Sequence, residues 1–92
     1  ALASCGIAYA LRYVRAAVEG GVQLGFRAAE AQAIVAETLR GAAALLDQPG
    51  AHAEAEIDKV TTPGGITIRG LNAMERAGFT NAVIAGLIES AK

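Results

Sequence analysis

The hydroxyl and glycine residues around Pro63 are the part of the sequence best suited to binding a ligand. The segment consists of Thr62, Pro63, Gly64, Gly65 and Thr67, and an apolar helical pattern follows it. Glycines leave backbone N–H groups accessible, and a helix N-terminus adds unpaired N–H donors at the positive end of its dipole. The segment therefore suits an anion such as a carboxylate or a phosphate.

The same segment also has a simpler interpretation. A Pro-Gly-Gly turn often only separates two helices, and Thr62 could be the N-cap of the second one. The segment lacks the lysine of a phosphate-binding loop, so a nucleoside triphosphate is not indicated. Elsewhere the sequence suggests neither a catalytic group nor a metal site. We expect Cys5 to be structural, and His52 and Glu54 to be solvated.

Five helices are expected to position this segment, and together they predict an all-α domain. Apolar residues recur at helical spacing over residues 7–24, with Gly25 as the stop, and again over residues 28–46. A turn at Pro49 precedes a short helix over residues 53–59. The fourth helix follows the Pro63 segment and ends near Gly78. The last helix begins at Thr80 or Asn81, either of which can cap it.

The second helix is apolar around most of its circumference, which predicts oligomerisation. A helix of this kind must be buried on nearly all sides. A chain of 92 residues has little with which to cover it. We therefore expect the chain to oligomerise. A compact monomeric bundle is the alternative.

Charge and composition exclude several other classes of protein. The net charge is −1 and no basic patch stands out, so we expect no nucleic-acid partner. The apolar runs are too short to cross a bilayer, so we expect no membrane association. The first residues lack an initiator methionine and the basic segment of a signal peptide, which predicts an internal part of a longer protein. A single cysteine fits a reducing cytoplasm.

Several segments, in order, resemble pyrroline-5-carboxylate reductases. Residues 60–75 are similar to that family's signature, in which a hydroxyl pair precedes Pro-Gly-Gly and a later threonine. Residues 4–9 resemble the family's Gly-Ser-Gly-Pro-Ala-Tyr opening, and residues 19–25 resemble its acidic-Gly-Gly-Val element. Residues 38–43 are similar to the helix that follows. The resemblance extends over essentially the whole chain.

The resemblance implies a function and an architecture. Family members reduce 1-pyrroline-5-carboxylate to L-proline with NADPH or NADH, in proline biosynthesis. They join an N-terminal Rossmann domain to a C-terminal helical domain, and two helical domains interlock. By this resemblance residues 1–92 are the C-terminal dimerisation and substrate-binding domain, without the Rossmann domain. It forms an intertwined homodimer that binds a cyclic imino acid. The residues implied at the substrate carboxylate are Thr62, Gly64, Gly65, Ile66 and Thr67.

Four positions depart from the family pattern. Ser4, Cys5 and Ile7 stand where the family usually has Gly, Ser and Pro. Thr62 replaces a more usual serine and keeps the hydroxyl. The chain has no Gly-x-Gly-x-x-Gly segment, so by itself it should bind no dinucleotide and should have no reductase activity. The alternatives are a stand-alone helical oligomerisation module without substrate binding, or a reductase of a different substrate.

Overall fold

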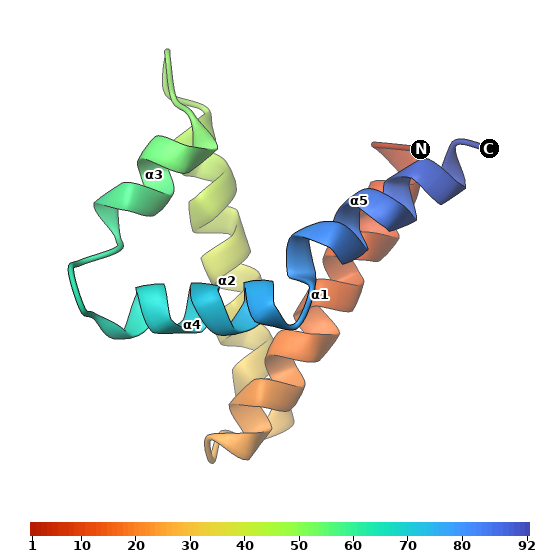
Figure 1. Ribbon diagram of the computed structural model, residues 1–92. Helices are drawn as coiled ribbons and strands as arrows, with labels where there is room; N and C mark the ends of the chain where they lie inside the picture. Colours follow the sequence, from red (N-terminus) through yellow and green to blue (C-terminus); the bar gives the residue numbers. More distant parts are fainter. The chain divides into compact units, whose positions relative to one another are not determined.

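Five α-helices and no strands make up the chain in the computed structural model, which describes all residues 1–92 (Figure 1). In order, the helices are α1 (Ser4–Gln23), α2 (Ala28–Leu46), α3 (Ala53–Lys59), α4 (Ile66–Arg76) and α5 (Phe79–Ser90). The predicted all-α class and the number of helices are confirmed. The bounds of α2 and α3 agree with the sequence pattern, whereas α1 begins before the first residue of its apolar pattern.

The helices fall into two compact units, Ala1–Asp47 and Gln48–Lys92. The first unit holds α1 and α2, and the second holds α3, α4 and α5. The predicted turn at Pro49 lies at the start of the second unit. There the Ala51 N–H donates to the Gln48 carbonyl at 3.0 Å, and Gly50 has a φ of 75°. Glycine adopts this left-handed conformation without the steric cost of a Cβ.

Helix α1 ends at Gln23, and Gly25, the stop that the sequence pattern predicted, follows its C-cap Leu24. Gly25 has a φ of 108°, and its N–H donates to the Val22 carbonyl at 3.0 Å. The Phe26 N–H donates to the Gly21 carbonyl, also at 3.0 Å. These two bonds form a Schellman motif, which satisfies carbonyls that a helix C-terminus otherwise leaves unpaired. The motif turns the chain back toward α2.

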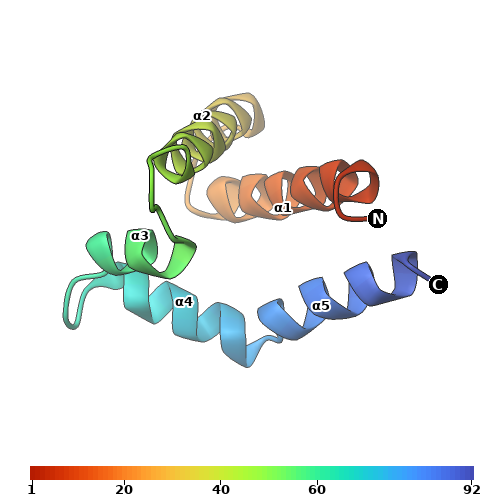
Figure 2. The ribbon, with the colours of Figure 1, turned by 90° about the horizontal axis from the view of Figure 1, so that it is seen from above.

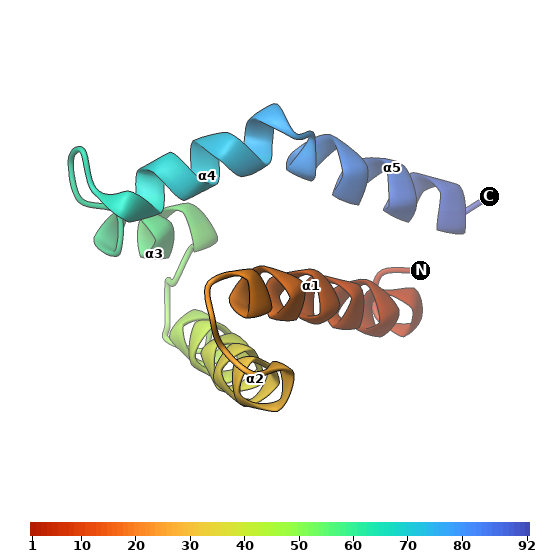
Figure 3. The ribbon, with the colours of Figure 1, turned by 90° about the horizontal axis from the view of Figure 1, so that it is seen from below.

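Helices α1 and α2 pack together within the first unit, and both rotated views show them as neighbours (Figures 2 and 3). Their closest approach involves Gly21. A Cβ added at Gly21 would lie 2.9 Å from the Cβ of Ala31, nearer than side chains pack. Ala31 is only 3% exposed and is the one buried residue of the chain. Gly21 therefore marks close packing between α1 and α2, whereas Gly20 has open space around it.

The two adjacent glycines of α1 are expected to respond oppositely to alanine. Gly21→Ala should destabilise the first unit, because overpacking a close contact costs about 1–3 kcal/mol. Gly20 has open space around its Cα, so Gly20→Ala should gain the helix propensity of alanine, about 0.5–1 kcal/mol. Thermal unfolding followed by circular dichroism should rank Gly20→Ala above the wild type and Gly21→Ala below it. Equal effects at both positions would contradict the close packing.

The junction of α4 and α5 differs from the sequence prediction. Gly78 has a φ of 93° and is itself the N-cap of α5, which begins at Phe79. Neither Thr80 nor Asn81 caps the helix. Instead the Thr80 N–H donates to Glu75 Oε1 at 3.2 Å, and the Thr80 hydroxyl donates to the same oxygen. The carboxylate at the end of α4 thus satisfies an amide at the start of α5. The sequence placed the boundary correctly at Gly78 but missed the bond from Thr80 back to Glu75.

Neither unit has a sizeable core. The α2 residue Ile34 is 52% exposed and the α5 residue Ile88 is 62% exposed. Leu45, Leu46, Val83 and Ile84 are exposed as well. The cover that α2 was expected to need on nearly all sides is therefore not supplied by its own unit. The helices carry apolar surface that these packing contacts do not remove from water.

Candidate functional site

The Thr62–Gly65 segment forms a tight turn between α3 and α4, seen as a narrow bend in Figures 2 and 3. The Gly65 N–H donates to the Thr62 carbonyl at 3.0 Å. Pro63 occupies the second position of this turn, and Gly64, with a φ of 68°, occupies the third. This is the residue pattern of a type II turn, which requires a positive φ at its third position. Gly64 therefore supplies the left-handed conformation that the turn requires.

The two adjacent threonines before Pro63 have different roles. The Thr61 hydroxyl donates to the Ile57 carbonyl at 2.5 Å, and the Thr61 N–H donates to the Asp58 carbonyl at 3.2 Å. These bonds close the C-terminus of α3. The Thr62 side chain is exposed and makes no hydrogen bond within the chain. Of the pair, only the Thr62 hydroxyl remains available to a ligand.

Helix α4 begins without a side-chain cap. Its N-cap is Gly65, in an extended conformation with φ −78° and ψ 175°, and no carboxylate lies in its first turn. Thr62 is therefore not the N-cap, and that part of the simpler interpretation is wrong. The first N–H groups of an α-helix have no partner inside the helix. In α4 these donors belong to Ile66 and Thr67, and both residues are exposed.

The exposed groups belong to one end of α4. They are the backbone donors of Ile66 and Thr67, the Thr67 hydroxyl, and the Thr62 hydroxyl, which lies against Gly65. The positive end of the α4 dipole adds to their attraction for negative charge. Gly65 differs from the other members, because the turn already uses its N–H. The arrangement offers donors and no competing acid, so it suits a carboxylate.

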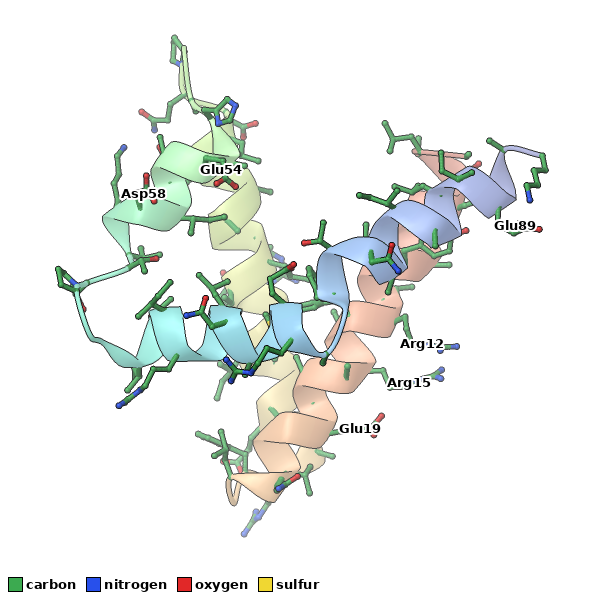
Figure 4. All side chains as sticks on the ribbon, viewed as in Figure 1. Arg12, Arg15, Glu19, Glu54, Asp58 and Glu89 are labelled. Carbon is green, nitrogen blue, oxygen red and sulfur yellow. The ribbon has the colours of Figure 1, made fainter.

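The other marked residues lie outside this arrangement. His52 is the N-cap of α3: its Nδ1 accepts the Glu54 N–H at 3.2 Å. The imidazole thus has a structural role, where the sequence suggested only solvation. Figure 4 shows Glu54 and Asp58 along α3. Cys5 is half-buried and unpaired. No group of three or more acidic, histidine or cysteine side chains is placed to hold a metal ion.

A groove of about 440 Å³ lies within the first unit, between α1 and α2. Its apolar lining consists of Leu11, Val14, Val18 and Ala36, and its polar lining consists of Arg15, Glu19 and Gln32. Figure 4 shows Arg15 and Glu19 projecting from the same side of α1 as Arg12. The chain's ion pairs lie elsewhere. The groove contains none of the residues assigned to the carboxylate.

No helix of the chain combines the length and the apolar character needed to cross a membrane.

Comparison with known proteins gives a consistent result. The family model described as "Pyrroline-5-carboxylate reductase dimerisation" matches residues 1–92. Pyrroline-5-carboxylate reductase 1 of Dictyostelium discoideum is 54% identical over 90 residues, which cover 98% of this chain and 16% of that protein. Pyrroline-5-carboxylate reductase 2 of the same organism is 48% identical over 92 residues, covering 100% of this chain and 31% of that protein. Pyrroline-5-carboxylate reductase 3 of Mus musculus is 37% identical and covers 94% of this chain.

A solved structure agrees with these relatives. The crystal structure of Plasmodium falciparum pyrroline carboxylate reductase with NADP bound superposes with a TM-score of 0.86 at 25% identity. The match covers 91% of this chain and 32% of that one. The chain thus spans a third or less of the length of each of these four relatives. Because the family model matches from the first residue to the last, the chain belongs to the pyrroline-5-carboxylate reductase dimerisation family.

Proposed function

We propose that this chain is the dimerisation and substrate-binding part of a longer reductase that converts 1-pyrroline-5-carboxylate to L-proline with NADPH or NADH. One observation carries the proposal: the start of α4 has neither a side-chain cap nor an acidic residue in its first turn, and the Thr62 hydroxyl lies against its N-cap Gly65. The chain also matches the family over its full length. The substrate is a cyclic imine that bears a carboxylate. The turn at Pro63 has the donors to hold that group.

The substrate carboxylate would sit at the N-terminus of α4. The N–H groups of Ile66 and Thr67 would donate to its oxygens, and the hydroxyls of Thr62 and Thr67 would complete the shell. Hydrogen bonds to an ionised group are stronger than those between neutral groups. Holding the substrate by its carboxylate fixes the position of its C=N bond, and orientation of this kind supplies a large share of catalysis.

The reducing cofactor would be bound by another part of the protein. The chain has no β-strand and no Gly-x-Gly-x-x-Gly segment, so its residues do not fit a dinucleotide. This agrees with a chain that covers about a third of a family member whose structure contains NADP. The contribution of this chain is to bind and orient the imine. No residue of it is assigned to proton transfer.

A second copy of this chain would cover the exposed apolar faces. Ile34 and Leu46 on α2, and Ile84 and Ile88 on α5, are all at least half exposed. Complete burial of a fully exposed side chain of this size stabilises by about 1.5–3 kcal/mol, so burying the exposed half of each contributes roughly half of that. An interlocked homodimer supplies that burial from helices of a partner, and it fits a family model described by dimerisation. The other proposed partner is the cyclic imino acid, and we propose neither a nucleic acid nor a membrane as a partner. The single free cysteine, Cys5, fits a protein that acts in the reducing cytoplasm.

Turnover by the full-length protein tests the assignment. Purified protein, supplied with 1-pyrroline-5-carboxylate and NADPH or NADH, should oxidise the reduced nicotinamide and form L-proline. The oxidation is followed by the fall in the absorbance of NADPH or NADH. L-proline should inhibit, whereas pyrrolidine, which lacks the carboxylate, should not. An isolated 92-residue chain should show no turnover. A full-length protein that forms a stable dimer but reduces no cyclic imine would instead indicate an oligomerisation module.

A further inference from the structure

The glycine at position 65 is not explained by its backbone conformation. With φ −78° and ψ 175°, Gly65 lies in the extended region that any residue adopts. Gly64 beside it differs, because its φ of 68° favours glycine. Donation of an N–H to the Thr62 carbonyl requires no glycine either. The reason for a glycine at position 65 must therefore be space.

The space in question is filled by Thr62. A Cβ added at Gly65 would collide with the Thr62 hydroxyl oxygen, and it would lie 3.2 Å from the Thr62 carbonyl oxygen and 3.6 Å from the Thr62 Cβ. The hydroxyl therefore lies against the bare Cα of Gly65, where α4 begins. The three atoms nearest to this position all belong to Thr62.

Threonine makes this arrangement more demanding than serine would. Its Cβ carries both a hydroxyl and a methyl group, so few χ1 positions are open to it. A hydroxyl displaced from Gly65 would exchange places with the methyl group or with hydrogen. The hydroxyl could not simply move a few tenths of an ångström, because the hydrogen bond from the Gly65 N–H to the Thr62 carbonyl, at 3.0 Å, keeps the two backbones close together.

We infer that Gly65 is a positioning residue. Because it has no Cβ, it leaves room for the Thr62 hydroxyl beside the free donors of α4, where that hydroxyl helps select a carboxylate-bearing imine. The inference rests on the proposed function. It gives Gly65 a role other than that of a direct ligand, in agreement with the engagement of its N–H in the turn.

A four-member cycle in the full-length enzyme tests the inference: wild type, Thr62→Ala, Gly65→Ala, and the double variant. Thr62→Ala should raise the KM for 1-pyrroline-5-carboxylate about 10- to 100-fold, the loss expected for one hydrogen bond to a charged group. Gly65→Ala should raise it by a similar factor. The double variant should be no worse than Thr62→Ala, because coupled residues are not additive. L-proline inhibition should show the same pattern, while inhibition by the cofactor product should not change.

Each other outcome decides a different point. Additive increases in KM would overturn the inference, since Gly65 would then act independently of the Thr62 hydroxyl. An unchanged KM in Thr62→Ala would also overturn the inference. The reductase assignment would not be affected, because it is tested separately by the turnover of the wild type. If Gly65→Ala fails to fold but the double variant folds, the clash with the Thr62 side chain is supported. If both fail to fold, the clash involves the Thr62 backbone and the inference falls.

Discussion

Ile34→Glu is expected to abolish dimerisation and to reduce helicity with it. Ile34 is 52% exposed on α2, and we place it in the proposed dimer interface. A charge placed in such an interface without a partner costs about 3–5 kcal/mol, which corresponds to a more than hundredfold weaker association. The effect acts once in each copy. Sedimentation over a range of concentrations should show a dimer for the wild type and a monomer for Ile34→Glu.

Arg40→Gln on the same helix is the matched control. Arg40 pairs with Glu37 at 2.5 Å, but both side chains are at least 70% exposed. Exposed pairs of this kind contribute less than about 1 kcal/mol, so this variant should remain a dimer. A wild-type chain that is a well-folded monomer at all concentrations would remove the argument for an interlocked dimer. The family assignment would still stand on the match to residues 1–92.

Thr67→Val is expected to raise the KM for 1-pyrroline-5-carboxylate about 10- to 100-fold in the full-length enzyme. The side chain keeps its shape and loses a hydroxyl, and a hydrogen bond to an ionised group contributes about 1.5–3 kcal/mol. Thr67 is exposed and makes no side-chain hydrogen bond within the chain. Its replacement should therefore change the free energy of unfolding by less than about 0.5 kcal/mol. Steady-state kinetics and thermal unfolding separate the two effects.

Thr67→Ser is the control for this prediction, because serine keeps the hydroxyl. It should retain most of the wild-type affinity, and L-proline should inhibit it normally. Equal KM values in all three proteins would show that the Thr67 hydroxyl does not contact the substrate. An increase in KM that follows a fall in the melting temperature would assign Thr67 a structural role instead.

Most of the candidate site could be predicted from the sequence. Pro63 and two glycines before an apolar helical pattern indicated a turn into a helix, and the turn forms there. The different roles of Thr61 and Thr62 could not be predicted. Both are threonines beside the same proline, and only the position of the Ile57 carbonyl shows which hydroxyl closes α3. The contact between Gly65 and Thr62 depends on a side-chain rotamer, which residue types alone do not specify.

The ends of the helices show where local signals suffice. Gly25 and Gly78 end helices because a left-handed residue there interrupts the helical hydrogen bonds, and both have positive φ. The cap on α5 is different, since Glu75 reaches Thr80 across that break. A search for a cap among adjacent residues could not find it. His52 was missed for a related reason: imidazole is an uncommon N-cap, so its type does not suggest one.

The sequence by itself determined the all-α class, the positions of five helices, the turn that precedes α4 and the need for additional apolar cover. These follow from local periodicity, from glycine and proline conformations and from the limited size of the chain. Only the tertiary structure decided that Gly21 meets Ala31, that Thr62 lies against Gly65, and that α4 begins without a cap. Each of these depends on where two backbones bring side chains together in space, and spacing along the sequence does not contain that information.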